Sequence, residues 1–522
     1  MTSSRGIDLV IPTVWDGTWG SQYSPHSPRA RSRLSWRSSP ASSRIAEMDR
    51  LTMDGFTRVL REAQILDNRS INAAGAAVIL PYGVELLRRF RAKVDTALRT
   101  AGLAEHEYPH LVPAALTGNV RTVVDLHDRL LLVATESEMT LGNAPLVLTP
   151  SGEMVIYAHW ARTIASRFDL PIRIYRRARY FRPVSRGRHA GRGVFHSAEH
   201  DDVFEFHCAH ATRGDQQQDL DQLRTVVAQL IRDLHVPVLW STRPPWTNHA
   251  EVANMAVAAD APLPLGLTAQ VACLYDQGTR FSRPYGIGFR ENGVFHHTEQ
   301  VAGYVSRRLL MTHLMLGLSQ RKRLFIHPEV APVQLLMLIR QQPVADGHFV
   351  SPLIQAFRNL GLRVRTILCD TPVALNRAGK QWARRGVPLI MQVFSPRSTD
   401  DRLKIVIERA DTGEELVVRL ANLLDLTDEL PALLSDLEDA FSTAVWNFAR
   451  SRVHATGTDD LQEVLGQRLV AVCPLAANEQ AARGIGALGK GEVLGYCRTD
   501  RTDPCVFSGA PVSTVAFISP RL

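Results

Sequence analysis

The chain contains little cysteine for its length: only six of its 522 residues are cysteines, and they lie far apart. A small disulfide-stapled scaffold needs a much higher density, so that class is excluded and a reducing compartment is favoured. No stretch of about 18 apolar residues occurs, so no segment qualifies as a membrane-spanning helix. We therefore expect a cytoplasmic protein with no membrane partner.

The remaining composition is typical of a globular protein, with 45% hydrophobic and 21% charged residues. A chain of this length exceeds one ordinary core and predicts about two to four domains. The formal net charge of +8 comes mostly from arginine, and the pI is near 9.3. This excess suits polyanionic partners such as tRNA or the phosphates of ATP, although a bias in genome composition would produce it equally well.

Composition shifts divide the chain into four segments. Residues 1–47 are rich in Ser, Arg, Pro and Trp and lack the apolar core of a signal peptide, so we expect a flexible N-terminal extension. Residues 48–320 mix helical patterns with short strand-like runs, and residues 324–425 alternate strands with helices. Residues 426–522 begin with an amphipathic helix and end in a small strand-rich unit. The expected fold class is mixed α/β (α+β).

The third segment has the clearest local patterns. Short apolar runs predict strands at 323–328, 362–370, 388–394 and 403–410, and longer patterns predict helices at 332–342 and 349–361. A compact α/β domain of about 100 residues follows from this alternation.

One arginine-rich stretch is a candidate for binding phosphate groups. It reads YFRPVSRGRHAGRGVFHSAEHDDVFEFHCAHAT over residues 180–212, and Arg182 ends its first predicted strand. Arginine suits a phosphate because its planar fork stays charged and pairs with two oxygens, and the loop glycines let a backbone approach a ligand. A surface hairpin with solvated arginines is the alternative interpretation of this stretch taken alone.

Several ordered stretches, covering roughly residues 52–515, together resemble the prolyl-tRNA synthetases, which are class II aminoacyl-tRNA synthetases. They are residues 75–113, 148–160, 170–182, 269–281, 306–315, 326–339 and 377–390. The resemblance implies a class II catalytic domain built on an antiparallel sheet, a class IIa anticodon-binding-like α/β domain and a small C-terminal domain. It also implies a homodimer that uses ATP with Mg²⁺ and an amino acid.

The resemblance assigns roles to individual residues. Arg182 would meet the α-phosphate of ATP, and Arg308 would stack on adenine. Because residues 306–315 align only loosely with the family's third motif, Arg307 is an alternative to Arg308. Arg182 and Arg308 are the catalytic candidates. Glu199 and Gln270 complete the expected ATP-binding set. The expected amino-acid-binding residues are Ser151, Glu153, Glu205, His207, Cys273 and Tyr275.

Departures from the family fall at several functional positions. Val184 replaces the carboxylate of motif 2, and His196 and Ala198 replace a basic pair. The proline-pocket sequence Gly-Thr-Ser-His is Ala-Cys-Leu-Tyr here, at 272–275, which adds side-chain volume. Cys273 is expected to be a small buried residue rather than a nucleophile.

The anticodon-binding and zinc positions also depart from the family. Ala383 and Ser398 stand where carboxylates would read guanines of the proline anticodon. A zinc-module Cys-x-x-Cys is reduced to Cys505 followed by Val506-Phe507-Ser508, and structural zinc normally needs four ligands, so no metal is expected.

Three functions stay open on this basis. The protein forms an aminoacyl-adenylate and passes the acyl group to tRNA, or it passes the same group to a small amine or hydroxyl acceptor in specialised amide-bond formation. The third alternative is a catalytically silent binding or regulatory protein. Loss of anticodon readers beside retained Arg182, Glu153 and Gln270 favours the small acceptor, whereas Val184 and Ala198 favour the silent protein.

Overall fold

A computed structural model describes residues 51–71, 76–126, 129–140, 145–183, 193–195, 199–318, 323–340, 350–394, 403–420, 426–427, 429–488 and 491–521. The predicted extension 1–47 lies outside these residues. Contacts group the described chain into two units, the first formed by 93–312 and 449–522 and the second by the described parts of 51–92 and 313–448. In the described residues, no helix is both long and apolar enough to cross a membrane.

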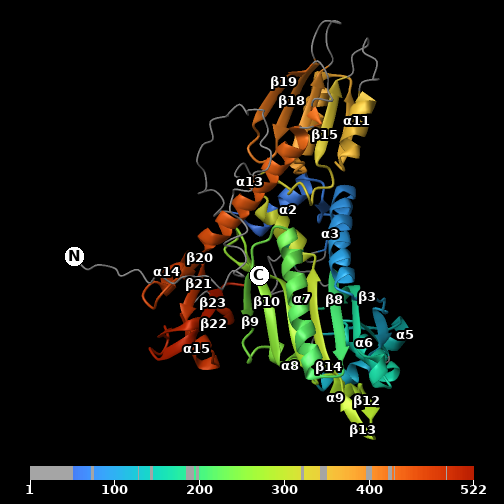
Figure 1. Cartoon of the computed structure of the whole chain (residues 1–522), viewed down its shortest axis with the longest axis vertical. Coiled ribbons are helices and arrows are strands. Elements are labelled where there is room, and N and C mark those ends of the chain that lie inside the picture. Colours follow the sequence, from blue (N-terminus) through green and yellow to red (C-terminus); the bar gives the residue numbers. More distant parts are fainter. Residues whose placement is uncertain are drawn as a thin grey trace, which may run out of the picture. The chain divides into compact units, whose positions relative to one another are not determined.

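The first unit is built on an eleven-stranded sheet, ordered β20-β21-β23-β22-β9-β10-β11-β14-β8-β7-β3 (Figure 1). All its neighbouring strands run antiparallel except β20 with β21 and β3 with β7. The strands are β3 (Ala104–Glu105), β7 (Ile172–Phe181), β8 (Glu199–His210), β9 (Leu239–Thr242), β10 (Met255–Pro262), β11 (Thr268–Gly278), β14 (Glu299–Ser306), β20 (Val453–Ala455), β21 (Val470–Pro474), β22 (Glu492–Pro504) and β23 (Pro511–Ser519). The predicted antiparallel sheet is thereby confirmed.

Smaller elements complete this unit. The strands β4 (Leu111–Pro113), β6 (Leu146–Leu148) and β5 (Leu131–Val133) form one small sheet, and β12 (Gly288–Glu291) pairs with β13 (Val294–His297). Its helices are α4 (Thr117–Arg121), α5 (Glu136–Thr140), α6 (Glu153–Thr163), α7 (Arg213–Asp233), α8 (His249–Val252), α9 (Ser282–Tyr285), α14 (Leu461–Gly466) and α15 (Glu479–Ala487).

Helix α7 covers one face of the sheet, where it contacts β8, β11 and β14. The hydroxyl of Thr212 accepts a hydrogen bond from the backbone of Asp215 and so caps the helix start. Leu220, Leu223 and Val227 recur at helical spacing and are buried. Helix α6 buries Met154, Ile156, Tyr157 and Trp160 in a separate apolar cluster, which fixes the beginning of that helix beside the sheet.

The second unit contains a five-stranded sheet, ordered β16-β15-β17-β18-β19. Its first three strands are parallel and the last two join antiparallel. The elements are α2 (Met53–Glu62), β1 (Leu66–Asp67), β2 (Val78–Ile79), β15 (Leu335–Arg340), α11 (Val350–Asn359), β16 (Val364–Cys369), α12 (Pro372–Arg384), β17 (Leu389–Phe394), β18 (Leu403–Arg409) and β19 (Glu415–Leu420). Three further helices have residues in both units, namely α3 (Pro81–Thr100), α10 (Arg308–Leu316) and α13 (Glu429–Arg452).

Two local predictions for this unit were wrong. The helix expected at 332–342 is strand β15, because its short apolar run lies in the middle of the parallel sheet with residues 335–339 all buried. The strand expected at 323–328 is not formed, and Leu324 makes only an isolated bridge to Leu318. The helices expected at 349–361 and from residue 430 onward are confirmed as α11 and α13.

Candidate functional site

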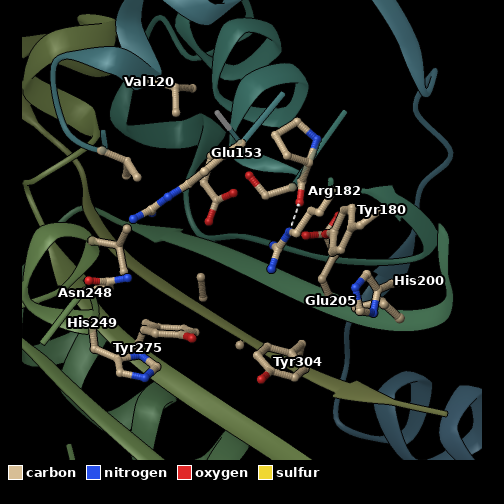
Figure 2. A pocket seen from close by; sticks show the side chains of 18 of the residues that line it. Val120, Glu153, Tyr180, Arg182, His200, Glu205, Asn248, His249, Tyr275 and Tyr304 are labelled. Atoms are coloured by element: carbon tan, nitrogen blue, oxygen red, sulfur yellow. Dashed lines mark hydrogen bonds between the residues drawn. The ribbon is translucent and has the colours of Figure 1, made fainter. Parts of the chain in front are cut away.

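A cavity of about 540 Å³ opens over the large sheet of the first unit (Figure 2). Its lining comes from β7, β8, β11, β14 and the beginnings of α6, α8 and α10. Eight of the predicted site residues line it, namely Ser151, Glu153, Arg182, Glu205, His207, Gln270, Tyr275 and Arg308. The chain therefore brings residues from positions 151 to 308 around one concave space.

Three arginines bring positive charge to the cavity lining, namely Arg129, Arg182 and Arg308, and the last two are each anchored by a side-chain hydrogen bond. The Nε of Arg182 donates to the carbonyl oxygen of Pro150 at 2.9 Å, and its guanidinium lies 5.7 Å from the centre of the Tyr180 ring. The Nε of Arg308 donates to the carbonyl oxygen of Phe195 at 3.2 Å. Since both side chains are anchored through Nε, their charged forks are suited to an anionic ligand.

Glu153 is the free carboxylate of the site. It lies in the first turn of α6, and within the described residues no hydrogen bond or ion pair reaches its carboxylate. In Figure 2, Glu153 and Arg182 point into the cavity from one side, and Tyr275 and Tyr304 lie across from them. An unpaired carboxylate beside an anion site is suited to a ligand that carries both an ammonium group and a negative charge.

The second carboxylate, Glu205, is held by the protein itself. Its Oε1 pairs with Nε of Arg176, and its Oε2 lies 3.2 Å from Nε2 of His207. The other ring nitrogen of His207 lies 2.9 Å from the hydroxyl of Tyr157, which donates to Oε1 of Gln277. Burial acts to raise the pKa of Glu205, but Arg176 and His207 outweigh it and hold the pKa below its usual value.

Gln270 is also fully engaged. Its Oε1 accepts from Arg243 at 2.7 Å, and its Nε2 donates to the hydroxyl of Tyr304 at 2.7 Å. Arg243 is in turn buried against Asp260, with both guanidinium nitrogens paired at 2.6 and 2.9 Å. Gln270 thus links a buried ion pair to Tyr304, a lining residue that sequence reasoning missed.

Tyr275 forms the opposite wall with a histidine that was not predicted. The rings of Tyr275 and His249 stack with centres 5.8 Å apart. Burial, and then the nearby Arg243, lowers the pKa of His249 to about 4, so this ring is neutral at pH 7. The wall around Tyr275 is therefore polar but uncharged.

Cys273 does not line the cavity. It is completely buried under it, packed with Ala256, Ala258, Tyr275 and Tyr304. The expectation of a small buried residue is confirmed. The expected contact between Cys273 and the substrate has no support in this packing, because the thiol is buried against Tyr275 and Tyr304 and does not line the cavity. Glu199 likewise lies outside the lining, where it pairs with Arg179 at 2.5 Å.

The burial of Cys273 predicts an inert thiol. Burial raises the pKa of this thiol to about 11, so almost none of it is thiolate at pH 8. We expect iodoacetamide at pH 8 to leave Cys273 unmodified in the native protein and to modify it after unfolding. Peptide mass spectrometry measures both states, and rapid native labelling would contradict the packing.

Some predicted positions lie outside the described residues. Val184, His196, Ser197 and Ala198 belong to this group, as do Pro396, Arg397 and Ser398. On the described part of α12, Trp382 and Ala383 are both buried.

The cysteines near the C-terminus lie in the strand-rich part of the first unit. Cys473 and Cys505 are buried in one apolar cluster, and Cys497 on β22 lies 3.1 Å from the carbonyl oxygen of Trp240.

Elsewhere, Cys208, His210 and Asp219 lie close enough to share an ion. Arg173 donates to Asp219 at 2.8 Å, however, so a guanidinium already neutralises that carboxylate.

Comparisons with known proteins agree with this arrangement. A proline–tRNA ligase of Methanothermobacter thermautotrophicus is 26% identical over 410 residues, which cover 77% of this chain and 82% of that protein. A proline–tRNA ligase of Methanoregula boonei is 26% identical over 474 residues, which cover 87% of this chain and 94% of that protein. No protein-family profile matches the chain.

Solved structures show the same architecture. The prolyl-tRNA synthetase of Cryptosporidium parvum, complexed with halofuginone and AMPPNP, has a TM-score of 0.79 at 16% identity and covers 94% of this chain and 99% of its own. The enzyme of Giardia lamblia, in complex with prolyl-adenylate, has a TM-score of 0.78 at 19% identity, with 90% and 99% covered. The fold is that of a class II aminoacyl-tRNA synthetase. More particularly, the chain is a prolyl-tRNA synthetase-like class II enzyme.

Proposed function

We propose that the chain activates an amino acid with ATP. A carboxylate oxygen of the amino acid attacks the α-phosphorus, the bond to the β-phosphate oxygen breaks, and pyrophosphate leaves with its electron pair. The product is an aminoacyl-adenylate, and the acyl group then passes to an acceptor. The observation that carries this proposal is the cavity that joins the free carboxylate of Glu153 to the guanidinium groups of Arg182 and Arg308.

In this proposal the protein supplies position and charge. Glu153, next to Ser151, holds the ammonium group of the amino acid, and Arg182 takes the charge that develops on the α-phosphate. Arg308 contacts the nucleotide and stacks on its base. No side-chain nucleophile is required, which agrees with the buried position of Cys273.

Magnesium enters as the counter-ion of ATP. The carboxylates that line the cavity in the described residues are Glu153 and Glu205, and Glu205 is already bound to Arg176 and His207. Within the described lining, no pair of unengaged carboxylates is available for the metal, and Mg²⁺ commonly takes phosphate oxygens and water as its remaining ligands.

The direct test is amino-acid-dependent exchange between ATP and labelled pyrophosphate, measured without tRNA across the twenty standard amino acids. We expect exchange with one or a few of them, which would establish adenylate formation and name the substrate. A folded protein that binds ATP but exchanges with none would contradict the proposal and favour a silent binding protein.

The acceptor is proposed to be tRNA, as in the ligases to which the chain is similar. A small amine or hydroxyl acceptor is the second candidate, and buried Ala383 favours it, because a methyl group cannot accept hydrogen bonds from a guanine edge. Transfer of labelled amino acid to total tRNA separates the two. Exchange without any acid-precipitable label on tRNA would favour the small acceptor.

Assembly and location follow from the same proposal. We propose that the chain acts as a cytoplasmic homodimer, as its resemblance to prolyl-tRNA synthetases implies. Sedimentation equilibrium of the purified chain measures the mass directly, and a monomer of 58.0 kDa at micromolar concentration would contradict the dimer.

A further inference from the structure

Arg176 is a buried arginine that pairs with the lining residue Glu205, and the activation chemistry leaves it without a role. It lies within β7, its side chain is only 2% exposed, and its Nε pairs with Oε1 of Glu205. The guanidinium also lies 5.7 Å from the ring centre of Tyr108 and 5.9 Å from that of Tyr180. Within the described chain, Nη1 and Nη2 are buried and have no hydrogen-bond partner.

Such an arginine is costly to bury. A guanidinium cannot lose its proton in a protein, so its charge must be balanced locally. Glu205 supplies the opposite charge, and the faces of the two tyrosines supply weaker cation–π attraction in place of hydrogen-bond acceptors. An ion pair that leaves two hydrogen-bond donors unsatisfied is weak evidence that Arg176 stabilises the fold. A role in positioning Glu205 therefore explains the burial of Arg176 better than a contribution to stability does.

The carboxylate of Glu205 is closed off from three directions. Arg176 holds one oxygen and His207 holds the other. At Gly152, a Cβ atom would collide with the same carboxylate, so the backbone before α6 packs directly against it. Glu205 therefore has neither the freedom nor the uncompensated charge to receive a substrate ammonium group.

Glu153 differs in each respect. It lines the same cavity, is partly exposed, and has no partner among the described residues. The adjoining wall carries the phenols of Tyr275 and Tyr304 and the amide of Gln277, none of which is charged at pH 7. Among the described carboxylates of the lining, Glu153 is thus the one whose negative charge no hydrogen bond or ion pair within the described chain compensates, in a cavity whose cationic lining residues are Arg129, Arg182 and Arg308.

We propose that Arg176 is a positioning residue that fixes Glu205 as a charge-balanced wall and leaves Glu153 as the single carboxylate for the substrate ammonium group. This inference rests on the proposed function and specifies how the site recognises the ammonium group of the amino acid.

The first test measures Glu205 itself and needs no activity. Carboxyl carbons of ¹³C-labelled glutamate are titrated by NMR in the native protein, and Glu205→Gln assigns the signal. The titratable groups around Glu205 are His207 on β8, Tyr157 on α6, and Tyr108 and His110 before β4. In Arg176→Met we expect the Glu205 midpoint to rise by about one pH unit or more, because His207 alone is then left to offset the effect of burial.

The second test uses the exchange reaction. In Arg176→Met we expect the KM for the amino acid to rise about tenfold or more, with the KM for ATP within about twofold of wild type. Arg176→Lys keeps the charge and should recover most of the loss. Arg173→Met is the matched control, since Arg173 is an ion-paired arginine of the same strand that pairs with Asp219 outside the cavity.

The outcomes separate the two proposals. Absence of exchange in wild-type protein would contradict amino-acid activation. The NMR titration would still test whether the ion pair with Arg176 lowers the titration midpoint of Glu205. An unchanged Glu205 midpoint in Arg176→Met, or equal losses in Arg176→Met and Arg173→Met, would overturn the positioning role.

Discussion

Replacing Arg182 with alanine should reduce ATP–pyrophosphate exchange by about three orders of magnitude, because the group that we propose for the charge on the α-phosphate is removed. The side chain is exposed to the cavity and makes one hydrogen bond to the carbonyl oxygen of Pro150, so the fold should survive. Initial exchange rates at saturating ATP and amino acid measure the loss, and circular dichroism verifies folding.

Two further variants sharpen this prediction. Arg177→Ala removes an exposed arginine from β7, the strand that ends just before Arg182, and should leave exchange unchanged. Arg182→Lys keeps a positive charge but loses the planar fork and the Nε contact, so it should recover only part of the rate. Full exchange by folded Arg182→Ala would contradict the assignment of Arg182 to the α-phosphate.

Replacing Glu153 with glutamine should raise the KM for the amino acid by about 10- to 100-fold. This range corresponds to the loss of one charge-assisted hydrogen bond worth about 1.5–3 kcal/mol. The KM for ATP should stay near the wild-type value, because Glu153 is assigned to the ammonium group alone. Exchange kinetics with each substrate varied in turn measure both constants.

Glu479→Gln is a matched control for Glu153, because Glu479 also lies in the first turn of a helix but is exposed and pairs with Arg483 on the surface. It should leave both KM values unchanged. A Glu153→Gln variant that altered only the KM for ATP would contradict the proposed role.

The stretches that resemble prolyl-tRNA synthetases predicted the catalytic fold, because each of them is a local sequence pattern that can be recognised without knowing the tertiary contacts. Arg182 and Glu153 could be placed in the cavity for the same reason, since each ends or begins a recognisable element. Strand β15 was missed because five consecutive apolar residues suit a buried helix as well as a central parallel strand. Only pairing with β16 and β17, distant in sequence, decides between them.

The site residues that were missed depend on contacts between distant strands. Cys273 pairs in register with Tyr304, and no sequence pattern indicates that residue 304 covers the thiol. Arg176 stands close to Arg177 and Arg179 in the sequence, and no pattern distinguishes it from these exposed neighbours. Arg176 is buried because its position on β7 is opposite Glu205 on β8, a pairing set by the sheet.

The continuity of the large sheet has a consequence for protein synthesis. Strands β22 and β23 come from the last residues of the chain, yet β22 pairs with β9, and Arg243 donates to the carbonyl oxygen of Leu494 at 2.6 Å. The backbone of Thr268 likewise donates to the carbonyl oxygen of Pro520 at 3.0 Å. A ribosome therefore synthesises β9 long before it synthesises the strand that pairs with it. Until β22 emerges, this edge of β9 stays without its partner strand.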